Sequence, residues 1–159
     1  YRPELAMITC SSVPREMSDS LARDFSLPVL KIDYPMARRA VRAGRRVGVA
    51  ATFPPTLAPT SKLLREAAAE AGVEIEIVDE VEPEAYKALL ANDAATHDRL
   101  LASAVERLQG RDVSAIVLAQ VSMARALPLL ERGARVPVLT SLHTSLEAVR
   151  EALGPTPRA

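Results

Sequence analysis

Residues Ile116–Met123 (IVLAQVSM) have the pattern of an apolar strand that ends in a small polar turn, and residues Ala6–Val13 (AMITCSSV) repeat it. A helical segment follows each stretch, and a second apolar strand follows each helix, at Leu27–Leu30 (LPVL) and Val136–Leu139 (VPVL). The order of strand, turn, helix and strand is therefore the same in both copies. This duplication predicts two related lobes built on parallel strands.

The two copies differ at one chemically decisive position, which lies in the turn after the first strand of each. Cys10 precedes Pro28 by about the same spacing as Gln120 precedes Pro137. If both copies fold alike, Cys10 and Gln120 lie at equivalent strand ends. We therefore expect a site between the lobes, with a thiol on one side and an amide on the other.

Composition argues against several classes of protein. With 48% apolar residues the chain can form a real core, so disorder is not expected. The formal charge is zero, which argues against a nucleic-acid surface, and no apolar run approaches membrane-spanning length. A single cysteine excludes an internal disulfide and a cysteine-based metal cage. Together with the lack of a visible signal peptide, it favours a cytoplasmic protein without a metal.

Short apolar runs alternate with longer helical patterns along the chain. Most of the runs lack the polar alternation of a strand with one wet face, so they predict a buried parallel sheet. Strands are expected at Leu5–Thr9, Val29–Ile32, Val47–Ala51, Ile75–Val78, Ala115–Ala119 and Val138–Thr140. Helices are expected at Pro14–Arg23, Pro35–Ala43, Thr60–Ala71, Pro83–Leu90, Ala94–Leu108, Ala124–Arg132 and Ser145–Leu153, the last with Thr144 as its N-cap.

This order predicts an α/β fold with two pseudo-symmetric parallel-sheet lobes. Gly44 marks the expected boundary, because a new series of strands and helices starts after it. The first lobe, residues 1–44, has only two strands, which are too few for a stable sheet, so it looks incomplete. The second lobe, residues 45–142, has four strands. Residues 143–159 form a C-terminal helix that we expect to pack back on the first lobe.

Small hydroxyl and amide residues gather at the expected carboxyl ends of the strands, where ligands bind in parallel α/β folds. Helix N-termini beside them offer N–H groups and a positive dipole end, which suit a carboxylate or phosphate. Cys10 is the only evident nucleophile or base. A strand-to-helix turn favours its thiolate form. The candidate residues are Cys10 and Gln120 for catalysis, and Ser11, Ser12, Thr52, Thr56 and Ser122 for substrate binding.

Each candidate also has a structural interpretation. Cys10 could be a buried packing residue, and Gln120 could be a surface or strand-end amide. The threonines after the third strand could cap the helix that follows, with or without a ligand contact. The two histidines are interpreted as structural, His97 as a solvated or hydrogen-bonded helix residue and His143 as a residue near a helix N-cap.

Five short motifs follow one another with a moderately specific order and spacing: Met7–Ser12 (MITCSS), Pro28–Asp33 (PVLKID), Val47–Thr52 (VGVAAT), Pro55–Leu57 (PTL) and Ala115–Gln120 (AIVLAQ). In these motifs the chain resembles the Asp/Glu/hydantoin racemase superfamily, over most of its length. Members of this superfamily have two α/β lobes related by a pseudo-twofold axis, with the site in the cleft. The resemblance thus implies the same architecture that the internal duplication predicts.

The resemblance implies cofactor-independent carbon-acid chemistry. In the racemases one cysteine from each lobe faces each side of the substrate α-carbon, and one thiolate removes the proton while the opposite thiol returns one. By this resemblance Cys10 is the first-lobe cysteine, with Ser11 and Ser12 as carboxylate contacts. Thr52 matches a second-lobe contact. The expected partner is a small-molecule carboxylate, with no cofactor, nucleic acid or membrane.

The chain departs from the family pattern in two places. Gln120 stands where the second cysteine is expected, and glutamine neither donates nor accepts a proton usefully at neutral pH. The family's N-terminal strand and the loop after it have no counterpart in the sequence, so the first lobe resembles a partial one. If no residues precede Tyr1, we expect a homodimer to cover its open edge.

The sequence therefore predicts an isomerase- or racemase-family enzyme that acts on a small carboxylate (an amino acid, a hydantoin-like compound or a dicarboxylic acid) through one cysteine. Cys10 would be the base or nucleophile, and Gln120 would donate a hydrogen bond to a developing enolate or carboxylate. The superfamily also includes one-cysteine decarboxylases and cis–trans isomerases such as maleate isomerase. A decarboxylase or C–C lyase is therefore an alternative, although the decarboxylases keep the cysteine of the other lobe. The other alternative is a homologue that binds carboxylates without turnover.

Overall fold

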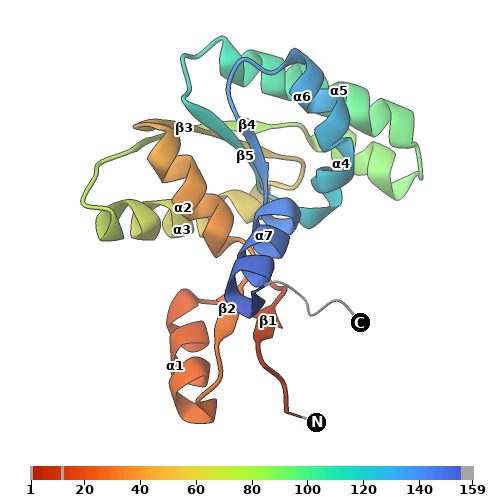
Figure 1. Ribbon diagram of the computed structural model, residues 1–159. Coiled ribbons are helices and arrows are strands. Elements are labelled where there is room, and N and C mark those ends of the chain that lie inside the picture. Colours follow the sequence, from red (N-terminus) through yellow and green to blue (C-terminus); the bar gives the residue numbers. More distant parts are fainter. Residues whose placement is uncertain (1, 12, 155–159) are drawn as a thin grey trace.

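Two parallel sheets form the framework of the chain, of which the computed structural model describes residues 2–11 and 13–154. The first sheet has the strand order β1-β2, and the second has the order β4-β3-β5-β6 (Figure 1). Every strand pair is parallel, which confirms the expected α/β class. The strands are β1 (Ala6–Ile8), β2 (Val29–Lys31), β3 (Arg46–Ala51), β4 (Glu76–Val81), β5 (Ala115–Leu118) and β6 (Val138–Thr140).

Helices connect the parallel strands, and two short 3₁₀ turns lie where the chain leaves β3 and β5. The helices are α1 (Arg15–Phe25), α2 (Tyr34–Ala43), α3 (Leu57–Glu70), α4 (Pro83–Leu90), α5 (Ala94–Gln109), α6 (Leu127–Gly133) and α7 (Ser141–Leu153). The 3₁₀ turns are η1 (Pro54–Thr56) and η2 (Val121–Ala126). Each of these turns therefore stands at the carboxyl end of a central strand, where the candidate site was expected.

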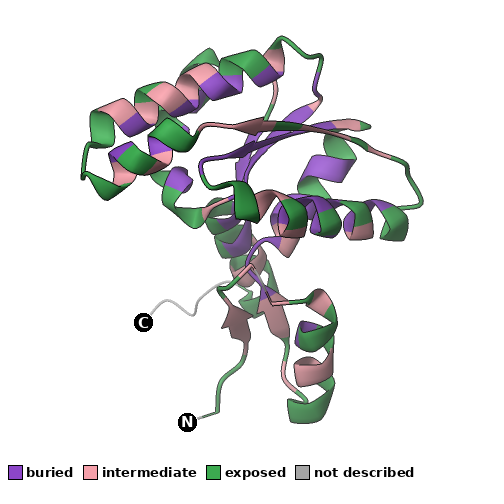
Figure 2. Ribbon diagram, turned by 180° about the vertical axis from the view of Figure 1, so that it is seen from behind, coloured by how far each residue is buried: buried purple, intermediate pink, exposed green. Residues whose placement is uncertain are grey.

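The core lies on both faces of the four-stranded sheet, because successive residues of a strand point to opposite faces. Val47 and Val49 of β3, with Val117 of β5, pack on the side of α2 and α3. Ala50 of β3 and Ile116 of β5 pack on the side of α5 and α6. Helices on both faces explain why these strands lack polar alternation, and Figure 2 shows the buried residues concentrated in this part of the molecule.

Helix α2 precedes the expected boundary at Gly44 but packs on the four-stranded sheet. Its buried residues belong to the same core as β3 and β5: Met36, Ala37, Ala40 and Val41. Gly44 joins α2 to β3 with a φ of 157°, and a Cβ atom built there would lie 2.3 Å from Ser114 Oγ, so this connection requires glycine. The division into segments 1–44, 45–142 and 143–159 stays a prediction.

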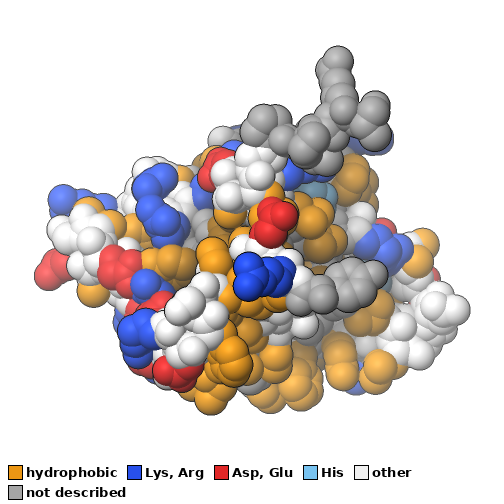
Figure 3. Space-filling view, turned by 60° about the horizontal axis from the view of Figure 1, so that its bottom comes forward, with side chains coloured by type: hydrophobic (Ala, Val, Ile, Leu, Met, Phe, Trp, Pro, Cys, Tyr) orange, Lys and Arg blue, Asp and Glu red, His pale blue; other side chains and the backbone are white. Residues whose placement is uncertain are grey.

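The two-stranded sheet has much less cover than the four-stranded one. All three residues of β1 are half-buried, and only Lys31 of β2 is buried. β5, the counterpart of β1, pairs with β3 on one side and β6 on the other, whereas β1 pairs only with β2 among the described residues. Figure 3 turns this end of the molecule forward and shows hydrophobic side chains at its surface. A homodimer over this edge stays a prediction.

Helix α7 contacts both lobes, because it packs against β2 as well as α2, β6 and η2. The expected N-cap at Thr144 is wrong. The helix begins at Ser141, and the Thr140 hydroxyl accepts a hydrogen bond from His143 N at 3.2 Å. Thr144 instead donates its hydroxyl to Thr140 O at 2.8 Å inside the helix. A β-strand end therefore leads directly into α7, without the loop that the sequence pattern indicated.

Several other expected boundaries shift by a few residues. The helix expected at Ala124–Arg132 is divided into η2 and the later helix α6, and the strand expected at Ile75–Val78 extends to Val81. Helix α3 starts at Leu57, before the expected Thr60. In the part of the chain that the structure describes, no helix combines the length and apolar character needed to cross a membrane.

Candidate active site

The turn after β1 carries Cys10, whose side chain is exposed. This excludes the interpretation of Cys10 as a buried packing residue. Val13 N donates to Cys10 O at 3.2 Å and closes the turn, and α1 begins two residues later, at Arg15. Ser11 is half-buried in this turn, whereas Ser12 lies outside the described residues. The thiol is therefore presented at the junction between a strand end and the start of a helix.

A buried lysine is hydrogen-bonded to the turn that carries Cys10. Lys31, the last residue of β2, donates from Nζ to Ser11 O at 3.1 Å and to Asp33 Oδ1 at 2.5 Å. Both side chains of the ion pair are less than a tenth exposed, at 4% for Lys31 and 8% for Asp33. Neither residue was among the candidates. The signal that could have found them is the pairing of a lysine with an aspartate two residues later, where the strand pattern ends.

The turn after β3 holds the side chain of Gln120, which follows β5. Gln120 Oε1 accepts hydrogen bonds from Thr52 N at 2.7 Å, from Thr52 Oγ1 at 3.0 Å and from Phe53 N at 3.3 Å. Thr52 is fully buried. These three donors fix the orientation of the carboxamide, so its two Nε2–H donors point away from this turn. The sequence did not reveal Phe53, because it contributes only its backbone N–H.

The two remaining candidates, Thr56 and Ser122, lie near this turn but form no hydrogen bond with Gln120 that the structure gives. Thr56 donates its hydroxyl to Phe53 O at 2.7 Å, and its backbone N–H reaches the same oxygen at 3.0 Å. It stands at the N-cap position of α3 but makes no side-chain cap bond. Ser122 is exposed on η2, two residues after Gln120. The structure thus brings Gln120, Thr52 and Thr56 together around Phe53.

Strand register shows that Cys10 and Gln120 hold equivalent places. Ile8 pairs with Lys31 at the end of β1, and Leu118 pairs with Thr140 at the end of β5. The same backbone bond opens each strand pair, since Pro28 O accepts from Ala6 N and Pro137 O from Ile116 N, both at 2.9 Å. Cys10 and Gln120 each follow the last paired residue of their strand by two positions. The duplication seen in the sequence is therefore a duplication of structure.

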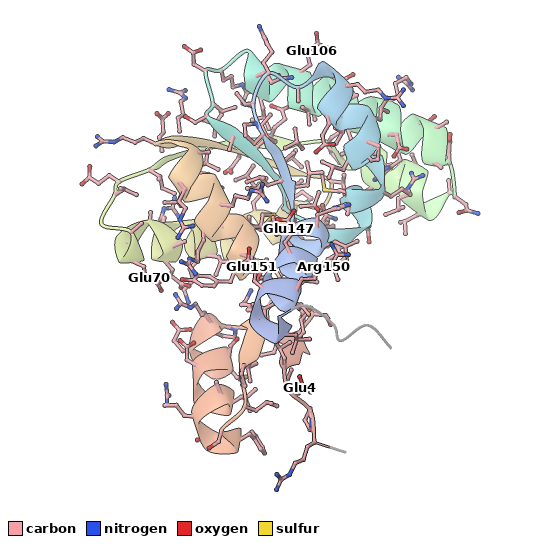
Figure 4. The ribbon with its side chains drawn as sticks, in the orientation of Figure 1. Glu4, Glu70, Glu106, Glu147, Arg150 and Glu151 are labelled. Atoms are coloured by element: carbon pink, nitrogen blue, oxygen red, sulfur yellow. The ribbon has the colours of Figure 1, made fainter. Side chains whose placement is uncertain are left out.

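The strand ends of the two lobes point toward one another. In Figure 1, β1 and β2 run toward the four-stranded sheet, while β5 and β6 run toward the two-stranded one. Figure 4 shows Glu147 and Glu151 along α7, which contacts β2 of the first lobe and β6 of the second. The hydrogen bonds that Gln120 and Thr52 form with described residues stay within the second lobe. The Gln120 turn is thus built from residues of the second lobe.

Both histidines form hydrogen-bond contacts through Nδ1. His97 is completely buried in α5, with Nδ1 2.9 Å from Asp98 Oδ1 and 3.4 Å from Arg125 Nη2, so it is hydrogen-bonded rather than solvated. His143 lies in the first turn of α7 with Nδ1 2.7 Å from Thr140 Oγ1. Residues 2–11 and 13–154 contain no cluster of three or more His, Cys, Asp or Glu side chains that could hold a metal ion.

These features define a class of protein: an α/β chain with duplicated parallel strand pairs whose carboxyl ends face each other. The chain belongs to the Asp/Glu/hydantoin racemase family, whose model matches residues 2–149. No match is found among curated proteins. The family match confirms the resemblance that the motifs indicated.

Solved structures of the same fold are similar over nearly the whole chain. A glutamate racemase from Bacillus anthracis is 16% identical with a TM-score of 0.65, and the match covers 95% of this chain and 59% of that one. An allantoin racemase from Klebsiella pneumoniae is 20% identical with a TM-score of 0.69, covering 94% and 59%. An arylmalonate decarboxylase is 21% identical with a TM-score of 0.66, covering 96% and 70%. The chain therefore spans about 59% of the length of both racemases.

Proposed function

We propose that this chain forms the catalytic part of a cofactor-independent enzyme that acts on a small carboxylate through the Cys10 thiol. The observation that carries the proposal is the pairing of an exposed thiol and an oriented carboxamide at equivalent strand ends. Its substrate would be an amino acid, a hydantoin-like compound or a dicarboxylic acid. One cysteine suits a reducing compartment such as the cytoplasm.

In the proposed reaction, the Cys10 thiolate removes the proton from the α-carbon. The C–H bond breaks, an S–H bond forms, and the electron pair moves onto the adjacent carboxylate to give an enediolate. The Gln120 Nε2–H donors, directed away from Thr52, would stabilise the oxygen that gains charge. Ser11, Ser12 and Ser122 would hold the remaining carboxylate oxygens. The thiol proton of Cys10 then exchanges with solvent, and return of a solvent-derived proton to the α-carbon completes the exchange.

The Gln120 contacts change the role that we propose for Thr52. Both its N–H and its hydroxyl donate to Gln120 Oε1, so these donors are occupied in this structure. We therefore propose that Thr52 positions Gln120, and that Thr56 supports the same turn through Phe53 O. A direct contact between Thr52 and substrate would require the Gln120 amide to move.

A decarboxylase is the second candidate, because a single thiol is sufficient for its chemistry. The C–C bond of a malonate-type substrate would break with release of carbon dioxide, and the electron pair would form the same enediolate. The Cys10 thiol would then protonate the α-carbon. The presence of one cysteine favours this candidate over reactions that need two thiols, although the decarboxylases of the superfamily keep the cysteine of the other lobe. A third candidate is a carboxylate-binding homologue without turnover.

The test is exchange of the α-proton in deuterated water, measured by NMR over a panel of small amino, hydroxy and dicarboxylic acids. We expect the wild type to exchange at least one of them and Cys10→Ala to lose about 100-fold or more of the rate. Ser103→Ala is the control, because α5 contributes no residue to either turn. Full exchange by Cys10→Ala would contradict the proposal. Carbon dioxide release from a substituted malonate would instead favour the decarboxylase. Tight binding without either reaction would favour the binding homologue.

A further inference from the structure

Lys31 differs from the other lysines of the chain in its surroundings. Its side chain is 4% exposed, whereas those of Lys62 and Lys87 are 63% and 70% exposed and pair with carboxylates on their own helices. Lysine is almost never buried unless it is paired, because its ammonium group loses hydration. Burial of Lys31 therefore needs the two acceptors that the structure gives it, Asp33 Oδ1 and Ser11 O.

The second lobe has a neutral residue at the equivalent place. Lys31 pairs with Ile8 at the end of β1, and Thr140 pairs with Leu118 at the end of β5. The Thr140 hydroxyl accepts from His143 N in its own helix and is not directed at the turn that carries Gln120. Of these two equivalent positions, the one in the lobe that carries the thiol holds a buried charge and the other does not, which a structural role shared by both lobes would not explain.

We propose that Lys31 is a positioning residue for Cys10. It holds the carbonyl of Ser11, while Val13 N holds the carbonyl of Cys10, so both peptide groups that follow the thiol are fixed. Its ammonium group is bonded to the carbonyl of the residue that follows Cys10, and a cation at this place in the turn would favour the thiolate form of Cys10. The inference rests on the proposed function only in taking Cys10 as the reactive group.

The charges around Lys31 come from each element that packs against β2. Asp33, just before α2, is its direct partner. Arg15 of α1 pairs with Glu70, and Arg39 of α2 pairs with Glu147 of α7, so these charges are compensated. Other charged groups on these elements are Glu16, Asp19, Arg23, Asp24, Arg38, Arg42, Arg150 and Glu151, and β1 carries none. Lys31 is paired as well, with Asp33, and it differs from these groups in that it is buried.

Alkylation of Cys10 by iodoacetamide tests the inference, because it is the only cysteine in the sequence. The double variant Lys31→Met with Asp33→Asn removes both charges and the donor to Ser11 O, yet leaves no unpaired buried charge. We expect its pH midpoint of alkylation to rise by about half a unit, which slows labelling at pH 7 about threefold. Lys87→Met, an exposed lysine on α4, should react like the wild type.

A second variant separates a charge effect from a general loosening of the turn. Asp33→Asn alone leaves the ammonium without its carboxylate, so the midpoint should fall below that of the wild type. A disrupted turn would move both variants in the same direction. Equal pH midpoints of alkylation in all variants, or a higher midpoint in Asp33→Asn, would overturn the inference. If the double variant does not fold, the midpoint of Asp33→Asn decides it alone.

Failure of this inference is distinguishable from failure of the proposed function. Alkylation needs no substrate and reads the thiol directly, whereas the exchange experiment reads turnover. If the Lys31 and Asp33 variants are alkylated like the wild type and Cys10→Ala loses exchange, only the proposed role of Lys31 is wrong. If the Lys31 and Asp33 variants shift the alkylation midpoint but Cys10→Ala keeps full exchange, the proposed catalysis is wrong. Lys31 would then position a thiol that takes no part in turnover.

Discussion

At the residue scale, Gln120 accepts three hydrogen bonds on one oxygen. Thr52 N, Thr52 Oγ1 and Phe53 N all converge on Gln120 Oε1 within 3.3 Å. A thiol at this position could not satisfy the fully buried Thr52 in the same way, since sulfur is a weak acceptor. The glutamine therefore joins the ends of β3 and β5.

We predict that Gln120→Leu destabilises the chain by about 1–3 kcal/mol, because the buried Thr52 donors lose their acceptor. Chemical denaturation measures the change. Gln109→Leu is the matched control, since its amide oxygen also accepts a backbone N–H, from Arg135. That N–H belongs to an exposed residue that water can reach, so the cost should stay below about 1 kcal/mol. Equal costs for the two variants would show that the Gln120 bonds contribute nothing special.

The sequence identified part of this site and not the rest, for physical reasons. Strand ends and small polar turns are local features, so Cys10, Gln120 and Thr52 could be placed from their spacing. The bond between Gln120 and Thr52 joins residues that are 68 positions apart, and only the fold brings them together. Lys31 was missed because a lysine in a short strand is expected at the surface.

At the element scale, helix ends were harder to predict than helices. The apolar stripes placed α3 and α5 to within a few residues, because burial of one face determines where a helix runs. The 3₁₀ turns η1 and η2 were not anticipated, since prolines and small residues near their ends are compatible with an ordinary helix start. The N-cap of α7 moved from Thr144 to Thr140 because a threonine that already ends a strand can cap the next helix.

Helix α5 provides a test of capping by charge. The Asp93 side chain accepts a hydrogen bond from Thr96 N at 3.0 Å, and this bond lowers the pKa of Asp93 below its ordinary value of 3.8. A carboxyl group whose pKa is lower in the folded state stabilises the fold at pH values above its pKa in the unfolded state. This stabilisation is lost as the pH falls through its pKa in the folded state.

We predict that Asp93→Asn lowers the Tm at pH 6 and that the difference from the wild type closes well below pH 3.8. Asparagine keeps the cap bond but not the charge, so the comparison isolates the charged part. Thermal unfolding followed by circular dichroism at several pH values measures it. A difference that is constant with pH would contradict the assignment of Asp93 as a charged cap.

At the scale of the whole molecule, two duplicated strand pairs each carry a turn at their carboxyl ends. The four-stranded sheet is covered by helices on both faces, which gives the second turn a rigid support. The two-stranded sheet supports the first turn with far less burial and relies on α7, which contacts both lobes. The central claim is that one carboxylate binds between the turns and touches both.

Titration of the ¹⁵N-labelled protein with the carboxylates of the panel, followed by NMR, tests this claim most directly. The signals of the Ser11 amide and of the Gln120 side-chain amide should both shift with a carboxylate that binds, and both should give the same Kd. The corresponding neutral amide, such as malonamide for malonate, is the control and should shift neither. A shift at one turn only, two different Kd values, or no shift at either turn across the panel would contradict the account.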